Sequence, residues 1–328
     1  MPSLKNRFII IAATSLAIFM LMLTAWFLRN HVTLAAPKGS NEVYLPLIAK
    51  KHPWVSPFGT ETQYTYFPNS TIFTRAEELG VSWIRLNGMI SWRALQPNEG
   101  DPIDWSMLSD FEDGLRTLKA AGIIPIVIAD DYPAWATIEP NSCGAIRTDK
   151  FAAYADFVAQ LADRYKTDEF NVHHWELGNE PDVDPSLVIT NNVWGCWGDI
   201  DDPYYGGEHY GEMLKVMTPA VKAANSNAKV WIGGLLLDSP NSEETNPGRG
   251  RPELFLQGIL EAGAAPYFDI VAFHFYVPYT SFRQDHDNGG GGGRWDEMGG
   301  GVLGKTSFLR NIMQQYGVTK PLFLNEMG

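Results

Sequence analysis

The hydrophobic residues of this sequence change their spacing repeatedly along the chain. Continuous apolar runs, such as residues 123–129, are typical of parallel strands that are buried on both faces. Between such runs, apolar residues recur three or four positions apart, as Leu108, Phe111, Leu115 and Leu118 do, which predicts helices that bury one side. Strands that alternate with helices predict an α/β fold with a parallel sheet.

From residue 54 to residue 328 this alternation runs without a break in composition and predicts one domain. The expected strands are 55–62, 81–86, 123–129, a short strand through Trp175, 230–237, 268–277 and 321–325. The expected helices are 70–79, 105–121, 150–165, one through 213–221, 253–262 and one through 308–313. Right-handed crossovers between parallel strands close such a chain into a (β/α)8 TIM barrel, which needs eight strands. We therefore expect a barrel that is incomplete at the C-terminus, with seven strands present and the eighth missing.

Two of the predicted strands end at a glutamate. In the motif WELGNEPD the strand stops at Glu180, because Pro181 lacks the N–H that a sheet ladder needs. In the motif PLFLNEMG the period of two places Leu322, Leu324 and Glu326 on one face of a strand. Barrel enzymes carry their catalytic residues at the carboxyl ends of the strands, so the two motifs predict a catalytic carboxyl pair assembled by the fold.

The two motifs resemble those of the retaining glycoside hydrolases of clan A, and families 39 and 5 most of all. The resemblance runs from about residue 55 to the end of the sequence. It implies that Glu180 is the general acid/base, that Glu326 is the nucleophile and that Asn179 binds the 2-hydroxyl of the sugar. It also implies cleavage of O-glycosidic bonds, expected to be β bonds, in oligo- or polysaccharides by double displacement. Neither a cofactor nor a metal is expected.

Three further positions match the family pattern. Arg85 corresponds to an arginine that braces the nucleophile, and His274 and Tyr276 correspond to a pair beside it. From the residues alone, Arg85 could instead form a buried salt bridge with Glu176. Glu176 lies an even number of residues before Glu180, so its side chain is also expected to point into the barrel. The aromatic platform that the family carries on its eighth strand has no counterpart here. The alternative function is therefore a catalytically inactive barrel that binds carbohydrate at the cell surface.

Retention needs one protonated and one ionised carboxyl group at the same site. A positive charge on Arg85 near Glu326 would favour the ionised nucleophile. Burial and the neighbouring negative charge would raise the pKa of Glu180. The sequence thus predicts that different surroundings give the two glutamates different pKa values, so that one acts as the acid and the other as the nucleophile.

Several other residues have two interpretations. Trp194 and Trp197 are candidates for stacking on sugar rings, and packing in the core is equally consistent with their pattern. His173 and His174 resemble half of a metal motif, which would make the chain a metal-dependent hydrolase, but core or surface histidines are the preferred interpretation. The acidic residues 199, 201 and 202 could bind calcium, although a solvated loop is preferred.

The sequence contains two cysteines, Cys143 and Cys196, both in predicted loops. An even pair of loop cysteines in an exported chain predicts a disulfide. It would tie the loop after the third strand to the loop after the fourth.

The N-terminus has the composition of an export segment. An apolar run from residue 8 to residue 28 follows two basic residues and precedes small residues at 33–36. Its length fits either a signal peptide or a single membrane span, so residues 1–36 are expected to be one or the other, followed by a linker over 37–53. The protein is therefore expected to be secreted, or anchored with its catalytic domain outside the cell. The net charge of −13 argues against nucleic acid as a partner.

Overall fold

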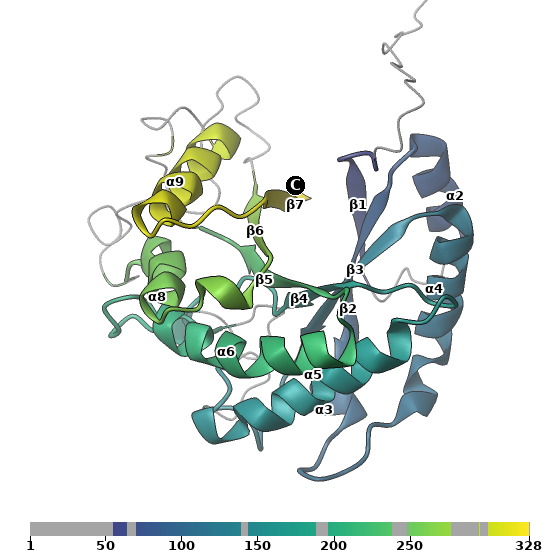
Figure 1. Cartoon of the computed structure of the whole chain (residues 1–328), viewed down its shortest axis with the longest axis horizontal. Coiled ribbons are helices and arrows are strands. Elements are labelled where there is room, and N and C mark those ends of the chain that lie inside the picture. The colour runs from purple at the N-terminus through teal and green to yellow at the C-terminus, as the bar shows by residue number, and fades with distance from the viewer. Residues whose placement is uncertain are drawn as a thin grey trace, which may run out of the picture. The chain divides into compact units, whose positions relative to one another are not determined.

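The computed structural model describes residues 55–63, 70–138, 144–187, 196–237, 248, 250–276, 295 and 301–327, all within the compact unit Trp54–Gly328 (Figure 1). The predicted export segment and linker lie outside the described residues.

Seven parallel strands form one sheet, and their order in the sheet is their order in the chain. They are β1 (Gly59–Gln63), β2 (Trp83–Ser91), β3 (Ile124–Asp130), β4 (His174–Leu177), β5 (Lys229–Leu235), β6 (Ile270–Phe275) and β7 (Leu322–Met327). Each strand pairs with the next in parallel, and the sheet curls until its two edges, β1 and β7, approach each other. This nearly closed sheet confirms the predicted (β/α)8 barrel with seven strands; an eighth is not among the described residues.

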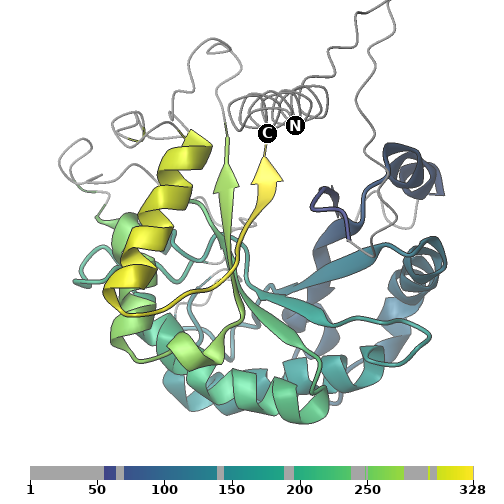
Figure 2. The same ribbon diagram turned by 45° about the horizontal axis from the view of Figure 1, so that its top comes forward.

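Helices cover the outside of the curled sheet (Figure 2). They are α2 (Ser70–Leu79), α3 (Trp92–Leu95), α4 (Ser109–Ala121), α5 (Phe151–Tyr165), α6 (Gly207–Ala224), α8 (Phe255–Glu261) and α9 (Gly301–Gln315). Short 3₁₀ turns occur at Trp105–Leu108, Thr148–Lys150, Pro185–Leu187, Pro252–Leu254 and Ala265–Tyr267. The predicted helices 105–121 and 253–262 therefore each begin with a 3₁₀ turn. Gly122 ends α4 with a left-handed φ of 72°, a conformation that suits glycine.

The strands bury both of their faces. The main core lies between the sheet and the helices and includes Ile84, Val127 and Val271. A second cluster, formed by Ile126, Trp231 and Ala272 with Trp83 and Phe323 packed against it, occupies alternate positions on the same strands. The period of two therefore places the second cluster inside the barrel.

The end of β7 departs from the period of two. Leu324 pairs with Phe273 and Glu326 pairs with His274, so one extra residue, Asn325, is inserted on β7. Such a bulge redirects the following side chain. Leu322 and Leu324 pack on the main core, whereas Glu326 contacts Arg85 inside the barrel. The prediction that these three residues share one face is therefore wrong.

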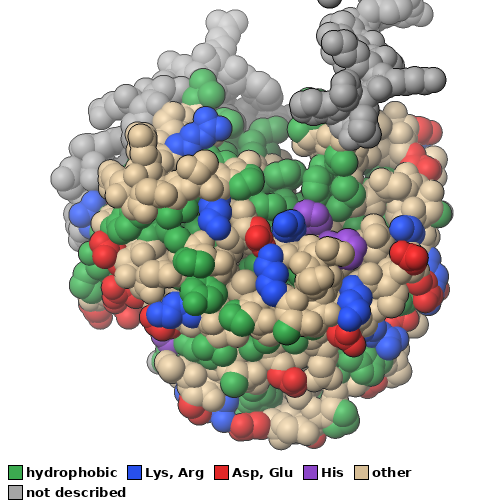
Figure 3. Space-filling view, in the orientation of Figure 1, with side chains coloured by type: hydrophobic (Ala, Val, Ile, Leu, Met, Phe, Trp, Pro, Cys, Tyr) green, Lys and Arg blue, Asp and Glu red, His purple; other side chains and the backbone are tan. Residues whose placement is uncertain are grey.

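On the face drawn in Figure 3, Lys and Arg side chains are interspersed with Asp and Glu. The described residues on this face show no broad basic surface.

Candidate active site

Glu180 lies directly after β4 in a tight turn. Its backbone has a left-handed φ of 49°, and its N–H donates to the carbonyl oxygen of Gly234 at 3.1 Å. The side chain is 3% exposed, and its Oε1 lies 2.8 Å from Nδ1 of His274. Burial, together with the charges of Glu326 and Asp182, raises the pKa of Glu180 to about 8. Glu180 is thus a carboxylic acid at neutral pH.

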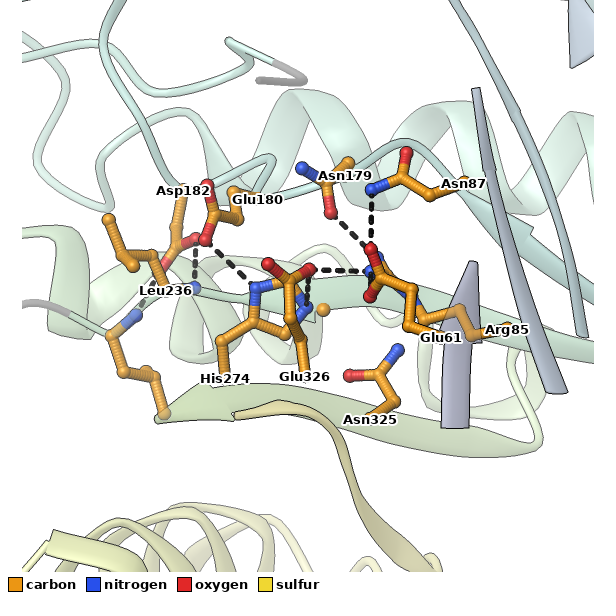
Figure 4. A network of polar contacts seen from close by, with 12 residues as sticks. Glu61, Arg85, Asn87, Asn179, Glu180, Asp182, Leu236, His274, Asn325 and Glu326 are labelled. Carbon is orange, nitrogen blue, oxygen red and sulfur yellow. Dashed lines mark hydrogen bonds and ion pairs between the residues drawn. The ribbon is translucent and has the colours of Figure 1, made fainter. Parts of the chain in front are cut away.

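Arg85, on β2, is a buried guanidinium that binds four side chains (Figure 4). Nε and Nη2 donate to the two carboxylate oxygens of Glu176 at 3.0 and 2.8 Å, and Nη2 also donates to Oδ1 of Asn179 at 2.6 Å. Nη1 donates to Glu61 at 2.7 Å and to Glu326 at 2.6 Å. Burial lowers the pKa of Arg85, but Glu176, Glu61 and Glu326 outweigh it and raise the pKa overall. Arg85 therefore pairs with Glu176 and also contacts Glu326, and its role toward a nucleophile stays a prediction.

Glu326, near the end of β7, is the second carboxyl group of the site. Burial and the charge of Glu61 raise its pKa, Arg85 opposes them, and the result is about 7. Its Oε2 lies 3.5 Å from Nε2 of His274. Near neutral pH Glu326 is thus close to its ionisation midpoint, whereas the higher pKa of Glu180 keeps that group mainly protonated.

His274, on β6, lies between the two glutamates, with Nδ1 toward Glu180 and Nε2 toward Glu326 (Figure 4). Burial and the positive charges of Arg85 and Lys305 lower its pKa well below the usual value, so the ring is neutral. A Cβ atom at Gly234 would lie 2.0 Å from Nε2 of His274, which shows how closely β5 supports the ring.

Tyr276 follows the last residue of β6, and its ring centroid lies 6.3 Å from that of His274. It lines a cavity of about 760 Å³ between β1 and β7, together with Glu61, Arg85 and Glu326. The lining of the cavity also includes the apolar side chains of Trp83 and Phe323. The structure thus brings together the carboxyl pair, Asn179, Arg85, His274 and Tyr276, as the sequence predicts.

The sequence analysis did not single out four polar residues of the site. Glu61 on β1 accepts from Arg85, and Asn87 Nδ2 donates to Glu61 at 3.1 Å. Asn325 Nδ2 donates to Glu176 at 2.9 Å. Asp182, which is 2% exposed, accepts the backbone N–H groups of Leu236 and Leu237, each at 2.8 Å. A polar residue on the inner face of a predicted strand is the sequence feature that could have identified them. At Glu61 this feature is weak, because strand 55–62 has few apolar residues and its inner face cannot be recognised from the sequence.

The two tryptophans differ in what the structure describes. Trp197 is 1% exposed, and its ring packs against Tyr132, Phe151 and Tyr210. Its indole N–H donates to the Tyr132 hydroxyl at 3.2 Å. Because these side chains cover the ring, Trp197 is a packing residue, and the prediction that it stacks on sugar is wrong for this structure. Trp194 lies outside the described residues.

Cys196 is 1% exposed and disulfide-bonded. Cys143, the other cysteine of the sequence, lies outside the described residues, so the predicted pairing stays a prediction.

The candidate metal ligands have other partners. Nδ1 of His174 accepts from the indole N–H of Trp231 at 3.1 Å inside the barrel, and His173 contacts Asn225. Asp199 and Asp202 accept N–H groups from their own loop. Within the described ranges no group of three or more His, Cys, Asp or Glu side chains could hold a metal ion. Likewise, no helix in the part of the chain that the structure describes is long and apolar enough to span a bilayer.

A parallel barrel that carries carboxyl groups after β4 and at the end of β7 has the architecture of a glycoside hydrolase. Residues 48–328 match the family Cellulase (glycosyl hydrolase family 5), and the chain belongs to this family. No curated protein matches the sequence significantly.

Among solved structures, Fpglu1 from Fervidobacterium pennivoraus is similar with a TM-score of 0.55 and 15% identity, over 80% of this chain and 67% of that one. A monomeric β-xylosidase from Caulobacter crescentus is similar with a TM-score of 0.54 and 18% identity, over 84% of this chain. The match spans 52% of the xylosidase. At these identities the likeness supports the barrel fold alone.

Proposed function

We propose that this protein is a retaining glycoside hydrolase that cleaves β-O-glycosidic bonds in oligo- or polysaccharides. The observation that carries the proposal is the different surroundings of two glutamates at one site. Glu180 is buried against a neutral imidazole and has a pKa of about 8, whereas Glu326 is held by the guanidinium of Arg85. Double displacement needs an acid and a carboxylate that flank the same glycosidic bond, and these two glutamates lie at one site, after β4 and on β7.

In the first step, Glu326 attacks the anomeric carbon and forms a glycosyl ester, while Glu180 gives its proton to the leaving oxygen. In the second step, the Glu180 carboxylate takes a proton from water, and that water attacks the anomeric carbon and releases Glu326. Glu180 and Glu326 are then restored to their starting protonation states.

Asn179 and Arg85 orient these groups. Oδ1 of Asn179 accepts from Nη2 of Arg85, which fixes the orientation of the amide beside the site, and the family resemblance assigns Asn179 to the 2-hydroxyl of the sugar. Arg85 also donates to Glu326 and stabilises its ionised form. Tyr276 lines the same cavity as Glu326.

The family description, cellulase, and the name of the similar β-xylosidase support a β-linked glucan or xylan as the substrate class. Export of the enzyme is part of the proposal. It is supported by the apolar run at residues 8–28 and by the disulfide at Cys196, since disulfides persist in oxidising compartments.

The test is covalent labelling of the chain with activated 2-deoxy-2-fluoro β-glycosides, followed by intact-mass and peptide analysis. One sugar adduct on Glu326 is expected, with none in Glu326→Gln. Slowed turnover of substrates with poor leaving groups is expected for Glu180→Gln, because only those need protonation. Binding of glucan or xylan oligosaccharides without adduct or turnover would replace the proposal with the carbohydrate-binding alternative.

A further inference from the structure

Glu61 is a carboxylate that the double-displacement mechanism does not use, yet it lies at the centre of the site. It projects from β1 and accepts from Nη1 of Arg85 at 2.7 Å and from Nδ2 of Asn87 at 3.1 Å. The same Nη1 donates to Glu326 at 2.6 Å. Two carboxyl groups from opposite edges of the sheet therefore meet at one nitrogen.

The charges at this point do not balance. The positive charge of Arg85 is already matched by Glu176, which is 0% exposed and uses both oxygens on the guanidinium. Glu176 also accepts from the N–H of Gly234 and from Asn325, so it is fully satisfied as a carboxylate. Glu61 and Glu326 each accept from Nη1, which has two N–H groups, and two like charges held this close to each other disfavour their joint ionisation.

We propose that Glu61 is a positioning residue for the nucleophile: it shares Nη1 of Arg85 with Glu326, holds the Glu326 side chain against β1, and sets the pH at which Glu326 ionises. The inference rests on the proposed function, in which Glu326 is the nucleophile. Glu61 need not contact the substrate in this role.

Other charged and titratable groups surround Glu326. They are Arg85 on β2, Glu176 on β4, Glu180 after β4, and His274 and Tyr276 at β6. Arg85 favours ionisation, Glu176 is held by Arg85, and His274 is neutral. Burial raises the pKa of Glu326 most, and the charge of Glu61 raises it further, in agreement with the geometry.

The test is a pH titration of Glu326 in the full chain. The titration is monitored by ¹³C NMR on protein whose glutamates are labelled at the side-chain carboxyl carbon. The signal of Glu326 is identified by its loss in Glu326→Gln. In Glu61→Gln the midpoint of Glu326 is expected to fall by about one pH unit, because a neighbouring negative charge is gone. The acid limb of kcat/KM should move down by the same amount, while the alkaline limb stays in place. The control is Glu99→Gln, which removes an equal charge from an exposed pair with Lys150.

An unchanged Glu326 midpoint in Glu61→Gln would overturn the inference. If that variant does not fold, Glu61→Asp is measured instead, because aspartate keeps the charge but is shorter by one methylene group. The midpoint of Glu326 is then expected to fall by a smaller amount. An unchanged midpoint in Glu61→Asp would also overturn the inference. The NMR titration needs no turnover. Absence of hydrolysis in the wild type would therefore refute the proposed function while the titration still decides the role of Glu61.

Discussion

Arg85 connects the fold to the proposed chemistry. Its guanidinium joins β2 to β4 through Glu176, to β1 through Glu61 and to β7 through Glu326. The planar fork of arginine allows this, since several N–H groups point in fixed directions within one plane. A lysine would offer one point charge and could not satisfy both Glu176 oxygens and two further carboxyl groups in this geometry.

Arg85→Met should destabilise the protein strongly, because it leaves Glu176 buried without a cation. A loss of about 3–5 kcal/mol in the free energy of unfolding is expected. Urea denaturation measures it. The matched control is Arg93→Met, whose pair with Asp131 is exposed and is worth at most about 1 kcal/mol. Equal losses in the two variants would contradict the role given to the buried pair.

The proposed mechanism predicts the pH dependence of hydrolysis from the two glutamates. In that mechanism turnover needs Glu326 ionised, so kcat/KM should rise with pH through about 7, the pKa of that group. It needs Glu180 protonated, so kcat/KM should fall as pH passes about 8. A narrow bell is therefore expected, with apparent pKa values that belong to the coupled pair.

Initial rates from pH 5 to pH 10 measure this bell. The matched variant is Glu180→Gln assayed on a substrate with a good leaving group, which should keep the acid limb and lose the alkaline one. A wild-type optimum below pH 6 would contradict the assignment of these ionisations.

At the scale of elements, the close approach of β5 and β6 fixes the imidazole between the two acids. Gly234→Ala places a Cβ at 2.0 Å from Nε2 of His274 and 2.9 Å from Oδ1 of Asn325. Overpacking of this kind costs about 1–3 kcal/mol, and a displacement of about 1 Å at the site costs about 100-fold in rate. A large fall in kcat/KM with a modest loss of stability is expected from kinetics and urea denaturation.

The control for this substitution is Gly263→Ala, where a Cβ meets nothing within 4 Å. That variant has the strain of a left-handed φ of 71° without touching the site, so its kcat/KM should match the wild type. Full activity in Gly234→Ala would show that His274 can move without consequence.

The order of the elements could be read from the sequence because each carries a periodic apolar pattern; α2, for example, has the predicted bounds. Irregular backbone was harder to predict. β2 continues to Ser91 through a register shift after Leu86, where the sequence suggested a loop. The bulge at Asn325 likewise has no periodic signal in the sequence. The sequence therefore predicts correctly that Glu326 lies at the end of a strand, but it predicts the wrong face of that strand for the side chain.

The site could be predicted as far as it rests on motifs. Glu180 and Glu326 stand out because each ends a strand, and Arg85 and His274 because they match a family pattern. Glu61 lies in a strand with little apolar character, and its importance arises only when β1 and β7 meet. Burial of Trp197 also depends on tertiary contacts with α5 and α6, which local sequence does not encode.

At the scale of the whole molecule, the barrel buries several acids whose pKa values are raised. They are Asp182 at about 6, Asp130 and Glu326 at about 7, and Glu180 at about 8. In the unfolded chain these carboxyl groups ionise near pH 4. The folded state thus binds more protons than the unfolded state between these limits, and the free energy of unfolding must fall as pH rises through them.

Urea denaturation at pH 7.0 and pH 8.5 tests this direction. Histidines add little there, because unfolded histidine is already largely neutral above its pKa of about 6.5. The stability of the wild type should fall between the two pH values. Glu180→Gln should show a smaller fall, because one titrating acid is removed; a wild-type stability that rises with pH would contradict the raised pKa values.

The left-handed backbone at Glu180 has a consequence for how this protein could change over generations. A φ of 49° disfavours glutamate by about 1 kcal/mol or more relative to glycine, and burial of the carboxyl group adds to that cost. Where no sugar selects for hydrolysis, selection for folding alone would favour replacement of Glu180. It would keep Arg85 and Glu176, since loss of either leaves a buried charge unpaired. Inactive descendants of this chain should therefore be recognisable by an intact Arg85–Glu176 pair beside a missing acid.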